Sequence, residues 1–226
     1  METRSAARVP VIGPGAFVVA TVVCGALSAC AWHTRGPVGW ERPIIVALRH
    51  EPPPFAHGLL LLWQPFPLVV STLGLAWIAS RSGRLALALF GSAGCVLAVF
   101  VTECVLKPLV GRQHLYQSSA VFPSGHVTAA AAWAMFAWLV VSPRSLLRPA
   151  LLLVPIAVSW AAIATGVHYP SDVIAGALVG GMIVYGTVTA ADRIGTRRPA
   201  AVIDLRATDH DRLTAGDRPS PSPATS

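Results

Sequence analysis

Charge is scarce in this sequence. Only 12% of the 226 residues are Asp, Glu, Lys or Arg, whereas 54% are hydrophobic and the mean hydropathy is +0.62. A soluble domain of ordinary composition carries roughly 25% charged residues. The shortage excludes such a domain and indicates an integral membrane protein.

Lysine is nearly absent as well. Of the seventeen basic residues, sixteen are Arg and one is Lys107. The net charge of +7 could point to nucleic acid, but a nucleic-acid binder gathers its basic residues on one face. Here they lie in pairs between apolar runs, which is typical of topology signals, so no nucleic-acid partner is expected. Lys107 stands out because a primary amine occurs at this position alone.

Cysteine is present without the spacing of metal ligands. The four cysteines lie in apolar runs, at Cys24, Cys30, Cys95 and Cys104. We interpret them as small packing residues and expect neither a metal nor a cofactor.

Six apolar runs are consistent with membrane-spanning helices. They cover approximately residues 11–32, 57–80, 85–106, 127–141, 146–167 and 173–191. The sequence therefore predicts an all-α polytopic membrane protein, with a six-helix membrane domain at residues 11–191. A short cytoplasmic segment, residues 1–10, precedes this domain, and a polar tail, residues 192–226, has the composition of a disordered segment.

Two segments allow a second interpretation. Residues 27–30, Leu-Ser-Ala-Cys, resemble the cleavage box of bacterial lipoproteins, which would make Cys30 a lipid attachment site. We favour an uncleaved first helix, because several further spans follow. Residues 40–49, within the Pro-rich connection of residues 33–56, read equally well as an amphipathic interfacial helix or as a plain loop.

The arginines also predict the orientation in the membrane. With six spans both termini lie on one side, together with nine of the basic residues that flank the spans: Arg4, Arg8, Arg81, Arg84, Arg144, Arg148, Arg193, Arg197 and Arg198. Five lie on the other side: Arg35, Arg42, Arg49, Lys107 and Arg112. The excess predicts cytoplasmic termini in the plasma membrane.

Two clusters of polar residues carry the chemistry, and both are predicted on the extracytoplasmic side. Pro123-Ser124-Gly125-His126 precedes an apolar helix, so Ser124 is a natural N-cap and the first amides can bind an anion. His168 follows forty-two residues later, and Asp172 lies one turn further on, where it can orient a nucleophilic imidazole. Taken alone, the first cluster fits a capped helix with an interfacial histidine equally well.

Together these motifs resemble the type 2 phosphatidic acid phosphatase superfamily, over about residues 57–191. The resemblance implies a metal-free phosphatase in which His168 is the nucleophile, Asp172 its charge-relay acid and His126 the general acid. It also implies that Lys107, Ser124 and the amide of Gly125 bind phosphate. The implied substrate is a lipid phosphate or diphosphate, such as an isoprenoid diphosphate or a phosphatidate-like lipid.

Both motif arginines of the family are missing. Lys107 is followed seven residues later by His114 where the family has Arg, and Ala161-Ala162 replace Ser-Arg before His168. We expect Arg112 and a protonated His114 to fill part of the phosphate pocket, and Ala162→Arg to return a guanidinium to it. Loss of both arginines leaves two alternatives to a phosphatase, namely a non-catalytic lipid-binding or lipid-moving protein and a lipid phosphotransferase.

Overall fold

The computed structural model of the chain describes residues 13–48, 53–113 and 120–196, so His114, the segment of residues 1–10 and most of the polar tail lie outside the described residues. The secondary-structure elements of the described residues are helices: α1 (Pro14–Thr34), α2 (Glu41–Leu48), α3 (Pro54–Leu61), α4 (Pro65–Arg81), α5 (Leu85–Phe100), the π-helical segment η1 (Val101–Leu106), α6 (Lys107–Val110), α7 (Gly125–Val140), α8 (Leu147–Ala150), α9 (Leu153–Ala164) and α10 (Pro170–Thr196). Helices α1 to α9, and α10 as far as Ala191, belong to one compact unit, and a second unit begins at Asp192.

Four helical stretches of the described chain are long and apolar enough to cross a membrane. They are Gly15–Thr34, Leu85–Val110, Leu147–Ala164 and Pro170–Ile194. Helices α3 and α4 provide a fifth span if they are taken together, and they are bent by 59° at the break before Pro65. The chain is thus an all-α, multi-pass membrane protein.

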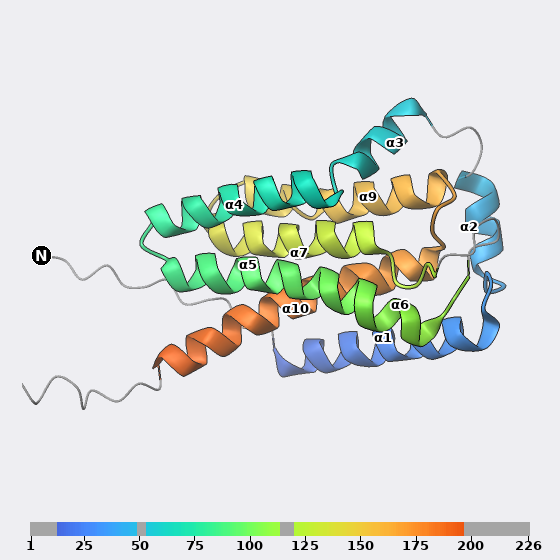
Figure 1. Ribbon diagram of the computed structural model, residues 1–226, viewed down its shortest axis with the longest axis horizontal. Coiled ribbons are helices and arrows are strands. Elements are labelled where there is room, and N and C mark those ends of the chain that lie inside the picture. The colour runs from blue at the N-terminus through green and yellow to red at the C-terminus, as the bar shows by residue number, and fades with distance from the viewer. Residues whose placement is uncertain (1–12, 49–52, 114–119, 197–226) are drawn as a thin grey trace, which may run out of the picture. The chain divides into compact units, whose positions relative to one another are not determined.

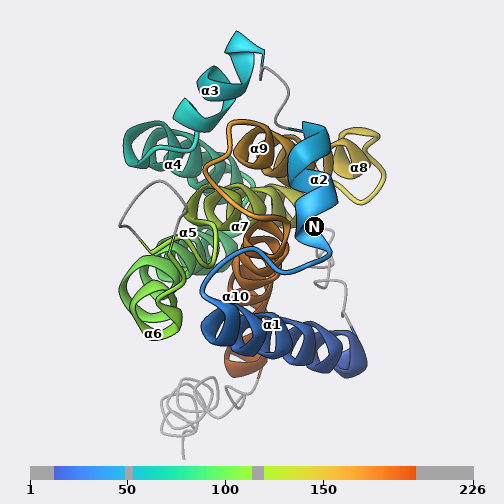
Figure 2. The ribbon, with the colours of Figure 1, turned by 90° about the vertical axis from the view of Figure 1, so that its right-hand side faces the viewer.

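Helix α7 accounts for the difference from the predicted six spans. Its 16 residues reach about 24 Å, less than the roughly 30 Å of a bilayer's hydrocarbon core. Figure 2 shows α7 surrounded by α4, α5, α9 and α10, and it packs directly on α4, α5 and α9. Its many buried alanines explain this central position, because small side chains let neighbouring helices approach.

Glycines bring α10 close to α7. A Cβ atom on Gly180 would collide with the carbonyl oxygen of Thr128, and one on Gly176 would lie 2.7 Å from the carbonyl oxygen of Ser124. Gly176 and Gly180 therefore allow the two helices to pack closely. This contact sets the beginning of α10 beside the beginning of α7.

The outer surface of the bundle is apolar. On α4 the side chains of Phe66, Leu73 and Trp77 are exposed by 79%, 61% and 66%. Such a surface fits lipid rather than water. Among the cysteines, Cys95 is buried as predicted, whereas Cys30 and Cys104 are exposed free thiols rather than packing residues.

Several helices begin or end at the same end of the bundle. Figure 1 shows that α6 ends, α7 begins, α9 ends and α10 begins at this end, where α2 also lies. Residues 41–48 of the segment 40–49 form a helix and not a plain loop, with Glu41 and Ile45 buried. The predicted catalytic residues all lie at this end.

Candidate active site

Two histidines that are far apart in the sequence meet at the end of the bundle. His126 is the second residue of α7, and His168 precedes α10 by two residues. Their ring centroids are 6.4 Å apart, with the rings edge to face. The Oγ atom of Ser124 accepts a hydrogen bond from the N–H of Val127 at 3.4 Å, which confirms the predicted N-cap. Capping thereby fixes the start of the helix that carries His126.

Asp172 lies behind His168, in the first turn of α10. Its Oδ2 atom is 3.7 Å from Nδ1 of His168 and accepts a hydrogen bond from the N–H of Tyr169 at 2.8 Å. The N–H of Ser124 donates to the carbonyl oxygen of Asp172 at 3.0 Å. This bond ties the beginnings of α7 and α10 together, so the two histidines are held by connected backbone.

Arg112 is fully buried, and its five N–H donors all have partners. Nη1 donates to Asp172 and to the hydroxyl of Ser171, both at 2.6 Å. Nη2 donates to Glu41 and to the carbonyl oxygen of Gly36, and Nε donates to the same carbonyl. The guanidinium also stacks 4.5 Å from the ring centroid of Tyr169. This arrangement disagrees with the predicted phosphate role of Arg112, because no N–H remains for a ligand.

Glu41 completes this buried network, and sequence reasoning missed it. It accepts hydrogen bonds from the N–H and the hydroxyl of Ser171, from the N–H of Val38 at 2.6 Å and from Arg112 at 2.6 Å. Burial alone would raise the pKa of Glu41, but these hydrogen bonds outweigh it and leave the pKa below its usual value. The carboxylate is therefore held ionised beside Arg112.

Lys107 forms an ion pair with Glu103. Its Nζ atom lies 2.7 Å and 2.8 Å from the two carboxylate oxygens of Glu103, four residues earlier in the chain. The same carboxylate contacts Gly125, since a Cβ atom there would overlap Oε1 of Glu103 and lie 3.5 Å from Nζ of Lys107. An amine, a carboxylate and a helix N-terminus thus meet at one point.

A cavity of about 880 Å³ opens at this point. Its polar end is lined by Lys107, Glu103, Gly125, His126 and His168. Its apolar part follows α4 and α5, and is lined by side chains that include Leu68, Val69, Leu73, Val96 and Val99. The cavity can therefore hold a molecule with one anionic end and one apolar end.

Gln64 is a second residue that sequence reasoning missed. Its side-chain nitrogen lies 3.2 Å from Nε2 of His126, at the break between α3 and α4. The sequence does hold a signal for Gln64, because it is a polar residue inside an apolar run, directly before Pro65.

Two positions that were predicted to serve the phosphate pocket do not line the cavity. Ser124 is completely buried and does not line the cavity, so in this structure it caps α7. Ala162 is also completely buried, in an apolar cluster with Ala130 and Val158. A guanidinium at position 162 would enter this cluster rather than the cavity, so the expected effect of Ala162→Arg does not follow from the geometry.

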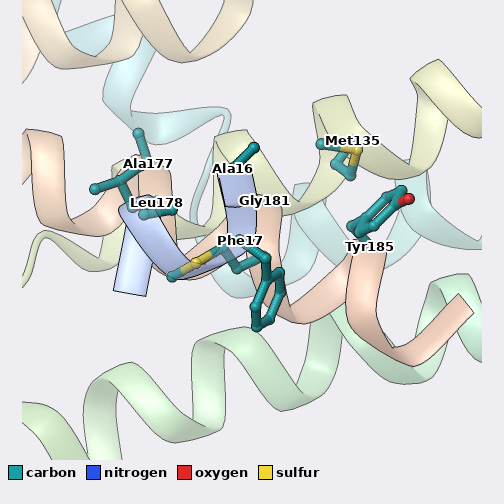
Figure 3. Close-up of a pocket in the computed structure, with 9 residues that line it drawn as sticks. Ala16, Phe17, Met135, Ala177, Leu178, Gly181 and Tyr185 are labelled. Carbon is teal, nitrogen blue, oxygen red and sulfur yellow. The ribbon is translucent and has the colours of Figure 1, made fainter. Parts of the chain in front are cut away.

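A second, smaller cavity of about 220 Å³ lies between α1, α7 and α10. Figure 3 shows Phe17 of α1 and Tyr185 of α10 among the side chains around it. No described residue lining it is ionisable apart from Tyr185, so it resembles a packing gap rather than a reaction site.

Comparisons with known proteins agree with the motifs. A family model described as the PAP2 superfamily matches residues 86–195. Among solved structures, a transmembrane PAP2-type phosphatidylglycerolphosphate phosphatase from Bacillus subtilis matches with a TM-score of 0.44 and 20% identity, over 82% of this chain and 98% of that chain. No curated protein matches the chain. Since the matched residues contain Lys107, both histidines and Asp172, the motif resemblance and the family match coincide, and residues 86–195 are a PAP2 superfamily segment.

Proposed function

We propose that this protein is a membrane phosphatase that hydrolyses a lipid phosphate or diphosphate through a phosphohistidine at His168. The observation that carries the proposal is the pairing of His126 and His168 across 6.4 Å at the polar end of an otherwise apolar cavity. A phosphoryl group between two such rings would have a nucleophile on one side and an acid on the other.

The first step forms the phosphohistidine. Nδ1 of His168 faces Asp172, so Nε2 is the nitrogen available to attack phosphorus. As the new N–P bond forms, the bond from phosphorus to the lipid oxygen breaks, and His126 donates its proton to that oxygen. Asp172 stabilises the positive charge that develops on the His168 ring.

The second step returns the enzyme to its starting state. His126, now neutral, takes a proton from a water molecule that attacks the phosphohistidine. The N–P bond breaks, inorganic phosphate leaves, and His126 is protonated again for the next cycle. If a lipid or sugar hydroxyl replaced the water, the same residues would transfer the phosphoryl group instead.

The cavity favours a lipid over a soluble phosphate. Between Gln64 and Leu73 the apolar part follows α4 for about 14 Å, which accommodates part of an acyl or isoprenoid chain. The phosphate would then lie near Lys107 and the start of α7. Lys107 is the one Lys or Arg lining the cavity within the described ranges, so the site has little positive charge.

The proposal includes the arrangement in the plasma membrane. We count α3 with α4 as one bent span and α7 as a short central span, which gives the six-helix bundle predicted from the sequence. The arginine distribution then places both termini in the cytoplasm and the two histidines on the extracytoplasmic side.

Phosphate release from lipid mono- and diphosphates, measured on purified protein in detergent, tests the function. His168→Ala should abolish release, and Asp172→Asn should leave a small residue of activity, because the ring keeps Nε2 but loses its orientation. His33→Ala serves as the control, because His33 is exposed at the end of α1. Release that survives in His168→Ala would contradict the mechanism. No release by the parent protein from any of these lipids would favour a non-catalytic lipid-binding or lipid-moving protein.

A further inference from the structure

The strongest unassigned feature of the cavity is the carboxylate of Glu103. Within the described part of the cavity wall, Lys107 is the only Lys or Arg, and both oxygens of Glu103 engage its amine. The positive charge that a phosphate would use is therefore already neutralised by a group of the chain itself.

The carboxylate also lies at the place that an anion would occupy. It contacts Gly125 so closely that a Cβ atom there would overlap Oε1. The first amides of a helix have no intrahelical acceptors and favour negative charge. In both charge and position, Glu103 thus substitutes for a phosphate between Lys107 and the start of α7.

Glu103 has room to leave this position. Its side chain is 42% exposed, whereas that of Lys107 is 19% exposed. It also belongs to η1, and π-helical turns often accompany functional sites. A partly exposed ion pair of this kind contributes little to stability, so a phosphate that binds Lys107 can displace Glu103.

We propose that Glu103 is a specificity-determining residue that competes with phosphate for Lys107 and the start of α7. That the ligand is a phosphate rests on the proposed function. Its binding requires the Lys107–Glu103 ion pair to open. Glu103 then weakens the binding of every phosphate, and weakens that of a dianion more than that of a monoanion, because repulsion grows with charge.

The dissociation constant of inorganic phosphate, measured by calorimetry on the full chain in detergent, tests this inference. Glu103→Gln keeps the size of the side chain and removes its charge, so we expect phosphate to bind about ten-fold more tightly. Glu103→Asp, which shortens the side chain by one methylene, should show a smaller gain. It provides a second reading if the glutamine variant folds poorly.

Lys107→Met separates competition from general electrostatics. In that background Glu103→Gln should change phosphate affinity less than about three-fold, because the amine for which the carboxylate competes is gone. Unchanged or weaker phosphate binding by Glu103→Gln and Glu103→Asp would overturn the proposal, and would mean that Glu103 merely positions Lys107.

Lipid turnover distinguishes the two proposals. Tighter phosphate binding by Glu103→Gln, together with no hydrolysis of any lipid phosphate by the parent protein, supports the role of Glu103 and rejects the phosphatase. Hydrolysis by the parent protein with unchanged phosphate affinity in both Glu103 variants supports the phosphatase and rejects the role of Glu103.

Discussion

The guanidinium of Arg112, buried near the start of α10, forms ion pairs with two carboxylates. Arg112 pairs with Glu41 and with Asp172, each at 2.6 Å, and all three side chains are completely buried. A buried charge that loses its partner is strongly destabilising. In the proposed mechanism the second carboxylate also matters for catalysis. Because Glu41 shares the charge of Arg112, the guanidinium does not neutralise Asp172 by itself, and Asp172 would stabilise positive charge on the His168 ring.

The Glu41→Gln substitution tests this positioning role. The amide keeps the size of the side chain but leaves Arg112 to Asp172 alone, so the positive charge that develops on His168 is less well stabilised. We expect kcat to fall roughly ten-fold while KM stays unchanged, since Glu41 does not line the cavity. Steady-state kinetics on a lipid phosphate measure both constants, with the exposed Arg42→Gln as a neighbouring control.

The pH dependence of thermal stability gives a second reading of the same variant. The folded pKa of Glu41 lies below its usual value of 4.5, so its ionisation stabilises the fold above that value and the contribution is lost as the pH falls through the folded pKa. Glu41→Gln should flatten this loss below about pH 4.5. A lower melting temperature at every pH with kcat unaltered would show a purely structural role.

At the scale of helices, the close contact of α7 and α10 is what brings His126 to His168. Gly180 leaves no space for a Cβ atom against α7, whereas a Cβ atom on Gly186, six residues along the same helix, would meet nothing within 4 Å. Gly180→Ala should therefore push the helices apart and destabilise the protein by about 1–3 kcal/mol. Gly186→Ala is the matched control and should be neutral or slightly stabilising, because alanine favours helix.

Thermal unfolding in detergent measures both glycine variants. Activity gives the link to function, because a shift of α10 against α7 also moves His168 relative to His126. If Gly180→Ala and Gly186→Ala unfold at the same temperature, the contact between the two helices is not as close as described.

Local signals explain which helices and site residues the sequence could predict. The apolar runs and the cap at Ser124 are each visible in a continuous stretch of sequence, and both recur in the structure. The pair of Glu41 and Arg112 was not readable, because 71 residues separate them and no periodic pattern connects them. The predicted phosphate role of Arg112 is wrong for the same reason, since only the fold shows that its donors are occupied.

At the scale of the whole molecule, the side of the membrane on which the cavity opens decides which lipid phosphates can reach it. Gln113 pairs with Ala120, which lines the cavity, and Ser142 lies in the connection after α7, at the other end of that helix. Both residues are exposed. If α7 spans the membrane, these two positions face opposite compartments, although α7, with 16 residues, is shorter than a typical membrane-spanning helix.

Single cysteines at these two positions test the orientation in intact cells. In a background with Cys24, Cys30, Cys95 and Cys104 replaced by alanine, Gln113→Cys should react with a membrane-impermeant maleimide added outside. Ser142→Cys should react only after permeabilisation, because the arginine excess places its side in the cytoplasm. The opposite pattern would place the histidines in the cytoplasm. Labelling of both positions from outside would mean that α7 does not span the membrane.

The orientation also determines which substrates are accessible. A cavity with His126 and His168 on the outer side can act only on lipid phosphates that reach the outer leaflet.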